Sequence, residues 1–160
     1  MSLFRCGGGG GTLKFDRLCY IKYRGKDQAE IPPISEADYG ASFSEYCSYD
    51  SSTKKFTVLK EFTALVVPWV YSYGTASGTN SKGQFRKNNN VVLASYTAPT
   101  RYKDSLAGTY LFHQFVVGDT FWNYTPSSNG YPQQMLKLYR IVNFDLNDIS
   151  DLLAFSDENA

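Results

Sequence analysis

Short segments rich in aromatic and β-branched residues, separated by clusters of turn residues, most strongly limit what this chain can fold into. They recur from residue 43 to residue 142, and the breaks between them are rich in Gly, Asn, Asp, Ser and Pro. Runs of Ala and Leu that favour helices are scarce, whereas aromatic residues make up 16% of the 160 residues. Short strands with turn signals at this spacing predict an all-β sandwich or barrel.

The densest apolar segment, 62–73, has the character of a central strand that is covered on both faces. Pro68 lies inside it and cannot donate a hydrogen bond to a ladder, which indicates a bulge or an edge position. Three asparagines at 88–90 favour a hairpin turn, because Asn tolerates left-handed backbone. The expected strands are 43–49, 55–59, 62–73, 84–87, 91–96, 105–116, 120–124 and 135–142.

A glycine-rich arm and linker are expected over residues 1–42. The five glycines from Gly7 to Gly11 lack the collagen period, so they indicate a flexible tether or a place where chains approach closely about a symmetry axis. Residues 12–23 alternate loosely and fit a short strand pair or an arm, while 24–42 are polar and fit a linker. The chain starts without a secretory signal pattern. We therefore expect either that the mature protein begins here or that it leaves the cell by another route, such as inside a virus particle.

The C-terminal segment 143–160 holds five acidic residues and no Lys or Arg. Ile149, Leu152 and Leu153 fall near helical spacing, which predicts a short amphipathic helix or acidic tail. Asp145, Asn147, Asp148 and Asp151 could offer oxygen ligands to calcium. The positions that a calcium loop fills with Gly and Glu are serines here, however, and a solvated, capped helix is the simpler interpretation.

Composition and charge exclude several classes of protein. A hydrophobic content of 42% and a net charge of +1 argue against disorder in the bulk of the chain and against a strongly basic, nucleic-acid-binding protein. No run of 18 apolar residues occurs, so no membrane insertion is expected. The middle of the chain, 43–142, is therefore expected to fold as one domain between the arm and the tail.

Residues that usually carry catalysis or bind metals are sparse. His113 is the only histidine, and it lies within a predicted strand with no nucleophile placed beside it, so a structural role is expected. Cys6, Cys19 and Cys47 show no paired spacing, which favours free thiols over a disulfide framework or a zinc site. We therefore expect no catalytic residues, no metal site, no cofactor and no enzymatic activity.

The best candidate for a binding face is the stretch 82–103, which holds five bases and no acid. Bases can bind the charge of an anionic sugar polymer while aromatic rings pack against the sugar. An ordinary solvated hairpin is the alternative. A second candidate for sugar stacking is the pair Trp122 and Tyr124, which could equally belong to the core or to an interface. The candidate ligand-binding residues are Lys82, Phe85, Arg86, Lys87, Arg101, Tyr102, Lys103, Trp122 and Tyr124.

In the order of its landmarks, the stretch 43–141 resembles the globular domain of the C1q/TNF-like superfamily. The landmarks are Phe43-Ser44 with Tyr46 at the place of the family's first strand, Tyr49-Asp50, the Lys55-Phe56-Thr57-Val58 segment, the aromatic strand from Phe62 to Tyr73, Asn89-Asn90-Val91-Val92, Leu106–Phe115 followed by Gly118-Asp119-Thr120-Phe121-Trp122, and the closing strand at 136–141. Glu61-Phe62 departs from the Gly and Tyr that usually enter the long strand. The resemblance implies an antiparallel jelly roll of about ten strands that forms homotrimers, binds protein or carbohydrate partners and is not an enzyme.

Residues 1–11 resemble the start of small tail-region proteins in prophages of Gram-positive gut bacteria. The two resemblances together imply a trimeric phage tail or fibre protein, placed in the virion or in the cytoplasm before assembly. Its jelly-roll loops would bind a host-surface glycan or receptor, and its other partners would be virion proteins. One alternative is a purely structural virion protein that contacts only neighbouring subunits, and another is a secreted C1q-like binding module.

The 26 aromatic residues bear on assembly, because one jelly-roll core cannot easily hide all of them. Aromatic side chains left on a surface favour interfaces, since they bury a large area at little cost in entropy. A tyrosine-rich face that simply meets solvent is the alternative. The composition thus favours association between chains.

Overall fold

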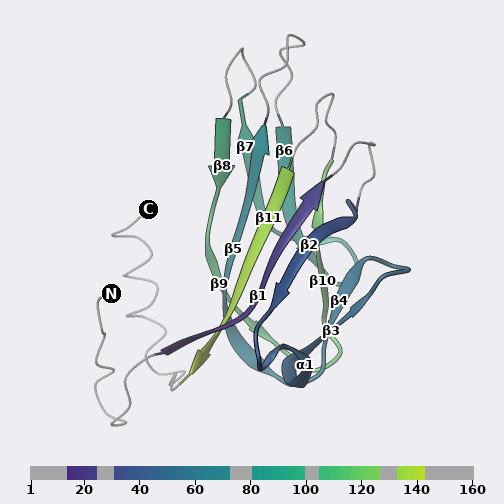
Figure 1. Ribbon diagram of the computed structural model, residues 1–160, viewed down its shortest axis with the longest axis vertical. Helices are drawn as coiled ribbons and strands as arrows, with labels where there is room; N and C mark the ends of the chain where they lie inside the picture. The colour runs from purple at the N-terminus through teal and green to yellow at the C-terminus, as the bar shows by residue number, and fades with distance from the viewer. Residues whose placement is uncertain (1–13, 25–30, 73–80, 100–104, 127–132, 143–160) are drawn as a thin grey trace.

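The computed structural model describes residues 14–24, 31–72, 81–99, 105–126 and 133–142, which form two antiparallel β-sheets packed face to face (Figure 1). One sheet has the strand order β2-β1-β11-β5-β8, with β9 also paired to β5, and the other has the order β3-β4-β10-β6-β7. The elements are β1 (Lys14–Arg24), β2 (Ile34–Tyr39), α1 (Phe43–Tyr46), β3 (Cys47–Asp50), β4 (Lys55–Val58), β5 (Phe62–Ser72), β6 (Ser81–Lys87), β7 (Val91–Ala98), β8 (Ser105–Gly108), β9 (Leu111–Phe115), β10 (Thr120–Tyr124) and β11 (Gln133–Val142).

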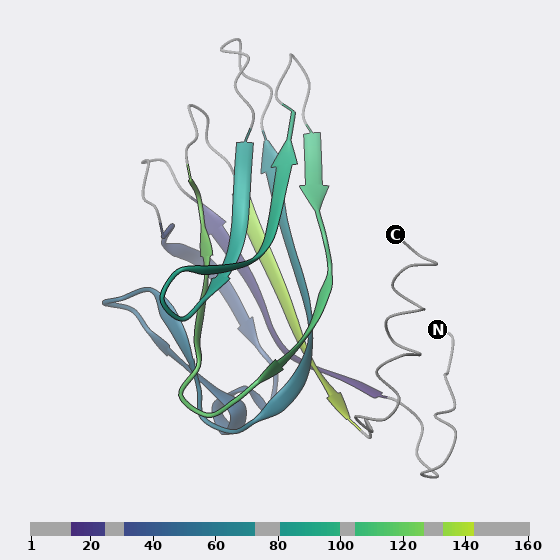
Figure 2. The same ribbon diagram turned by 180° about the vertical axis from the view of Figure 1, so that it is seen from behind.

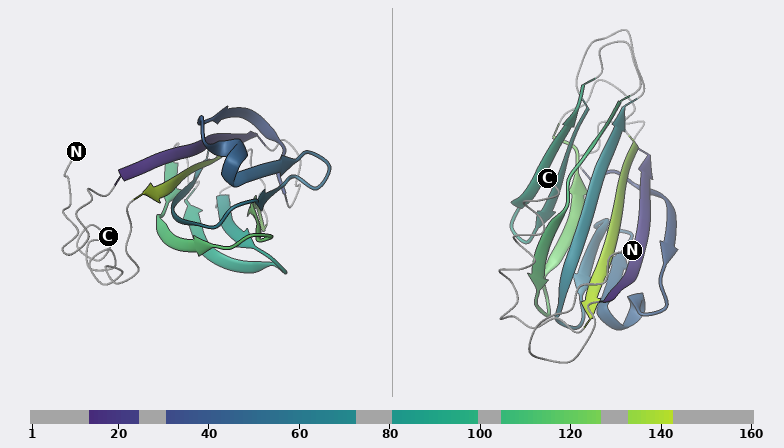
Figure 3. Two further views of the ribbon diagram at one scale, coloured as in Figure 1. Left: turned by 90° about the horizontal axis from the view of Figure 1, so that it is seen from below. Right: turned by 90° about the vertical axis from the view of Figure 1, so that its left-hand side faces the viewer.

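The expected all-β antiparallel sandwich is confirmed. Figure 2 views the molecule from behind, with the five-stranded sheet toward the viewer. The two views in Figure 3 show the two layers and the neighbouring strands β1, β11 and β5 of the larger sheet. No helix in the described ranges is long and apolar enough to cross a membrane. The glycine run and the expected C-terminal helix lie outside the described residues.

The sheet begins at Lys14, inside the segment for which the sequence favours an arm and linker. Strand β1 lies between β2 and β11, with Ile21 opposite Leu136. A register shift between Arg17 and Cys19 places two consecutive buried residues, Leu18 and Cys19, in the strand. This irregularity breaks the alternation by which a half-buried strand is recognised. Strand β2 is an edge strand with mostly exposed side chains, so its sequence looks like a polar linker.

Two other expected strands differ from the structure. The stretch 43–49 is a short helix, α1, followed by β3, and both Phe43 and Tyr46 point into the core. A spacing of three residues places both side chains on one face of a helix, whereas in a strand they would face opposite sides. The stretch 105–116 is two strands, β8 and β9, separated by Thr109 and Tyr110.

Pro68 explains that separation. It lies in β5, which has neighbours on both sides, rather than at an edge or a bulge. The Pro68 carbonyl accepts a hydrogen bond from the Thr109 N–H at 3.1 Å. In an antiparallel strand the N–H and C=O of one residue face the same neighbour, so the missing N–H of Pro68 also faces the interruption between β8 and β9.

A cluster of phenylalanines fills part of the space between the sheets. The Phe121 ring lies 5.0 Å from Phe56, 5.1 Å from Phe115 and 5.8 Å from Phe85, between ring centroids. All four side chains are fully buried. Because side chains alternate along a strand, the inward Phe85 and Phe121 place Arg86 and Trp122 on the outward face of the five-stranded sheet.

Candidate binding face on the five-stranded sheet

The outward face of the five-stranded sheet carries a row of cations and aromatic rings across β4, β10 and β6. In register, Trp122 of β10 lies opposite Arg86 of β6, and Tyr124 lies opposite Gln84. Strand β4, which carries Lys55, lies on the other side of β10. Opposite residues of paired strands share one face and are close enough for their side chains to interact.

Lys55 covers the ring of Trp122. The Lys55 Nζ atom lies 4.1 Å from the ring centroid, which is cation–π distance. Trp122 is only 2% exposed, although it lies outside the two clusters of buried side chains that make up the core. Its indole N–H is buried and has no hydrogen-bond partner among the described residues. The accessible group at this position is therefore the ammonium and not the indole ring.

Arg86 is fixed by two neighbours. Its guanidinium carbon lies 3.4 Å from the centroid of the Tyr124 ring, so the guanidinium stacks on that ring. Its Nε and Nη2 atoms donate to the Gln84 Oε1 atom at 2.8 Å and 2.6 Å. Within the described ranges neither Arg86 nor Lys55 forms an ion pair with a carboxylate. Two oriented cations thus remain without a negative partner in this part of the chain.

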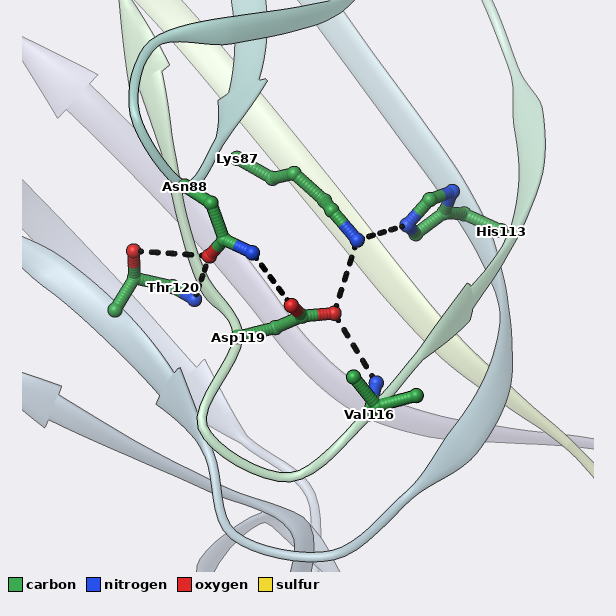
Figure 4. A network of polar contacts seen from close by, with 6 residues as sticks. All are labelled: Lys87, Asn88, His113, Val116, Asp119 and Thr120. Carbon is green, nitrogen blue, oxygen red and sulfur yellow. Dashed lines mark hydrogen bonds and ion pairs between the residues drawn. The ribbon is translucent and has the colours of Figure 1, made fainter.

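A second group of polar residues links the β6–β7 turn to the β9–β10 turn (Figure 4). Lys87 donates to Asp119 Oδ2 at 3.0 Å, and its Nζ atom lies 3.1 Å from His113 Nε2. Asn88 donates to Asp119 Oδ1 at 2.6 Å and accepts from the Thr120 N–H at 2.7 Å. We call these five residues the turn latch. It fixes two turns that are far apart in sequence.

The electrostatics of the turn latch follow from its partial burial. Burial acts to raise the pKa of Asp119, but hydrogen bonds from Asn88, the Val116 N–H and Lys87 outweigh it, and the pKa lies below its ordinary value. Burial and the neighbouring Lys87 lower the pKa of His113, against the weaker pull of Asp119. The charge of Lys87 is therefore compensated within the molecule and is not available to a ligand.

The structure divides the predicted ligand-binding residues. Arg86, Trp122 and Tyr124 come together on one face, and Lys82 is exposed at the start of β6 on the same face. Phe85 lies in the core, because it alternates with Arg86, and Lys87 belongs to the turn latch. Arg101, Tyr102 and Lys103 lie outside the described residues.

Sequence reasoning missed two members of this face, Lys55 and Gln84. Both alternate with inward-facing residues of their strands, Phe56 and Phe85, so strand periodicity alone signals that they point outward. What the sequence could not supply is the pairing of β10 with both β4 and β6, which brings them to Trp122 and Tyr124.

The outward face of the six-stranded sheet has a different character. Leu65 of β5 lies opposite Tyr139 on one side and Phe112 on the other, and Trp69 lies opposite Met135. These side chains are half-buried, except for Met135, which is 9% exposed. The Trp69 indole N–H is buried and has no partner among the described residues. Apart from Lys137, which lies opposite Val67, a band of apolar and aromatic side chains therefore crosses β11, β5 and β9, and we call it the apolar face.

The described residues do not form a metal-binding group. No three or more His, Cys, Asp or Glu side chains in these ranges gather closely enough to hold an ion. The contacts of His113 are with Lys87 and with the Phe115 ring, whose centroid is 4.7 Å away. His113 thus takes part in packing and in the turn latch.

No family model matches the sequence, and no curated protein matches it. The structure is similar to that of Eiger TNF from S. frugiperda, with a TM-score of 0.58 and 8% identity over 81% of this chain and 96% of that one. It is equally similar to the globular domain of zebrafish complement 1qA, with a TM-score of 0.58 and 11% identity over 79% and 96%. The chain therefore has a C1q/TNF-like jelly-roll fold, as the sequence resemblance implies.

Proposed function

We propose that this chain is a non-enzymatic binding module that forms a homotrimer through the apolar face of its six-stranded sheet. In the assembled particle the module binds a host-surface glycan. The fold shared with Eiger TNF and the complement 1qA globular domain supports a non-enzymatic role, because the C1q/TNF-like fold is generally non-catalytic.

The apolar face is the observation that carries this proposal. Leu65, Val67 and Trp69 are alternate residues of β5, opposite Tyr139, Lys137 and Met135 of β11 on the same outward surface, and Lys137 is the one cation among them. Aromatic, Met and aliphatic side chains gathered at one place are typical of the buried centre of an interface between subunits. Three copies that pack about one axis would cover this face in every subunit without leaving an open edge.

Association through this sheet leaves the five-stranded sheet facing outward. That face carries Lys55 and Arg86, whose charges have no carboxylate partner in the described ranges. A surface with unpaired, oriented cations favours an anionic ligand over a purely structural contact. The placement of the module on a phage tail or fibre, with other virion proteins as neighbours, is part of the same proposal.

The mass in solution tests the trimer. Light scattering on a size-exclusion column should give about 54 kDa, three times the 18.0 kDa of one chain. Leu65→Glu places a charge between Tyr139 and Phe112 on the apolar face and should shift the mass to that of one chain. Thr57→Glu changes a half-buried residue on the outward face of the other sheet and should keep the trimer. A monomeric wild-type protein would contradict the proposal.

Binding to intact Gram-positive gut bacteria tests the ligand. The labelled trimer should bind the cells, and enzymatic removal of surface glycans should abolish that binding. A trimer that binds no surface glycan, but is found in purified phage particles, would favour the purely structural virion role.

A further inference from the structure

We propose that the row Lys55, Trp122, Arg86, Tyr124 and Gln84 is a binding strip for the phosphate groups of a phosphate-bearing surface glycan. The inference rests on the proposed function and deepens it. It places the ligand on the flat outward face of the five-stranded sheet and not on the loops at its ends.

Both cations are held in place before any ligand arrives. Arg86 is stacked on Tyr124 and hydrogen-bonded twice to Gln84, and Lys55 is held over Trp122. A cation that is already oriented loses less conformational entropy when it binds an anion. With Nε and one Nη2 hydrogen directed to Gln84, Arg86 retains the end of its guanidinium, between Nη1 and Nη2, for two oxygens of a phosphate.

The spacing of the two cations suits an extended ligand. Lys55 and Arg86 lie on strands separated by one intervening strand, so their backbones are about 10 Å apart. A polymer with anionic groups at intervals of this length can contact both cations at once. Exposed Lys82, Ser95 and Thr97 lie beyond Arg86 on β6 and β7 and can bind hydroxyl groups of the same chain.

The aromatic rings of the strip favour a glycan over a nucleic acid, which also carries phosphates. Proteins that bind single strands use free aromatic faces on which bases stack. Here Trp122 is 2% exposed, and the Tyr124 ring is covered on one side by the Arg86 guanidinium. The strip therefore offers charges and hydrogen-bond donors, which suit a phosphate-bearing polyol or sugar better than unpaired bases.

One acidic residue lies beside the strip. Asp50 is opposite Lys55 in register, but its carboxylate accepts hydrogen bonds from Ser52 and Thr53. These bonds, from the Ser52 hydroxyl first, hold the pKa of Asp50 at about 2. Asp50 is thus a fixed negative charge that weakens anion binding next to Lys55. Replacing it with the neutral Asn should therefore raise the affinity for an anion.

The test measures binding of the full chain to purified polyol-phosphate teichoic acid by biolayer interferometry. Arg86→Gln and Lys55→Gln should each weaken binding about tenfold, whereas Asp50→Asn should strengthen it about twofold, a gain that misfolding cannot produce. Arg86→Lys should recover only part of the affinity, because an ammonium lacks the planar fork. Lys60→Gln removes an exposed cation that pairs with Glu45 and should change nothing.

Other polymers supply the outcomes that would overturn the inference. Polygalacturonate, an oligothymidylate or neutral dextran should bind more weakly than the teichoic acid. Equal or tighter binding of the carboxylate polymer or of the oligonucleotide would overturn the assignment to a phosphate-bearing glycan. Teichoic acid binding that is unchanged in Arg86→Gln would overturn the strip alone, and the mass of the particle would still decide the trimer separately.

Discussion

At the scale of single residues, partners across the sheet decide which side chains are available to a ligand. Arg86 and Lys87 are adjacent bases on β6, yet they face opposite sides of the sheet. Arg86 stacks on Tyr124, while Lys87 is neutralised by Asp119 in the turn latch. The sequence shows both as bases in a stretch without acids, and it could not reveal that Asp119, 32 residues away, compensates one of them.

The turn latch makes stability depend on pH through His113. Burial and Lys87 lower the pKa of His113 in the folded chain from its ordinary value of 6.5, so the unfolded chain binds more protons near that pH. The stabilisation is complete above about pH 6.5 and is lost as the pH falls through that value toward the lower pKa of the folded state. We expect the free energy of unfolding, measured in urea, to decrease between pH 8 and pH 5.5.

His113→Gln provides the control, because glutamine can still accept a hydrogen bond from Lys87 but does not titrate. The variant should show a flatter dependence over the same range. The lowered pKa of Asp119 acts in a separate window, below about pH 4, where stability is lost as the carboxylate becomes protonated. An equally steep loss between pH 8 and pH 5.5 in His113→Gln would assign the effect to another group.

At the scale of elements, strands with regular alternation or dense apolar sequence could be predicted, and irregular ones could not. The long strand β5 and the β6–β7 hairpin lie where the sequence predicts them. Strand β1 was hidden by its register shift at Leu18, and β2 by its exposed, polar side chains. The break between β8 and β9 depends on Pro68 of β5, a contact with a strand about 40 residues earlier that no local pattern contains.

The β9–β10 turn gives a test at this scale. Gly118 has a φ of 88°, and a Cβ added there would meet nothing within 4 Å. Gly118→Ala should therefore destabilise the protein by about 1–2 kcal/mol through backbone strain alone. Gly118→Asn should cost less, because Asn adopts left-handed backbone more readily. Chemical denaturation of the two variants measures the difference.

Gly83 on β6 provides the contrast. A Cβ at this position would meet the ring of Tyr96, which lies directly over the glycine. Gly83→Ala should cost about 1–3 kcal/mol through steric overlap, and Gly83→Asn should be worse because its side chain is larger. At position 118 alanine should therefore destabilise the protein more than asparagine, and at position 83 asparagine should destabilise it more than alanine. The same order at both would show that one mechanism is misassigned.

At the scale of the whole molecule, the two outward faces have different chemistry, and this difference links assembly to binding. An apolar face buried about a threefold axis would leave three binding strips on the outside of one particle. A glycan polymer that contacts more than one strip gains avidity, because the second contact is intramolecular. A modest affinity for a single phosphate group would then suffice for firm attachment to a surface that carries many.

The two buried thiols report on how this sandwich opens. Cys19 lies on β1 of the six-stranded sheet and Cys47 on β3 of the five-stranded sheet, and both are free and at most 1% exposed. Burial raises the pKa of both thiols, to about 12 for Cys47. Few thiolates therefore form in the folded state, so alkylation by iodoacetamide in native buffer should be at least about a hundredfold slower than in denaturant.

Replacing Cys6 by serine leaves only these two thiols in the chain, one in each sheet. If the sandwich opens only as a unit, both should be alkylated at the same rate, and destabilising variants such as Gly118→Ala should raise both rates by the same factor. Mass spectrometry of peptides resolves the two sites. Faster alkylation of Cys19 alone would mean that β1 separates from β11 before the five-stranded sheet opens. Because β11 carries part of the apolar face and β1 lies next to β11, trimer formation would then suppress that reaction selectively, whereas a uniform opening would slow both sites together.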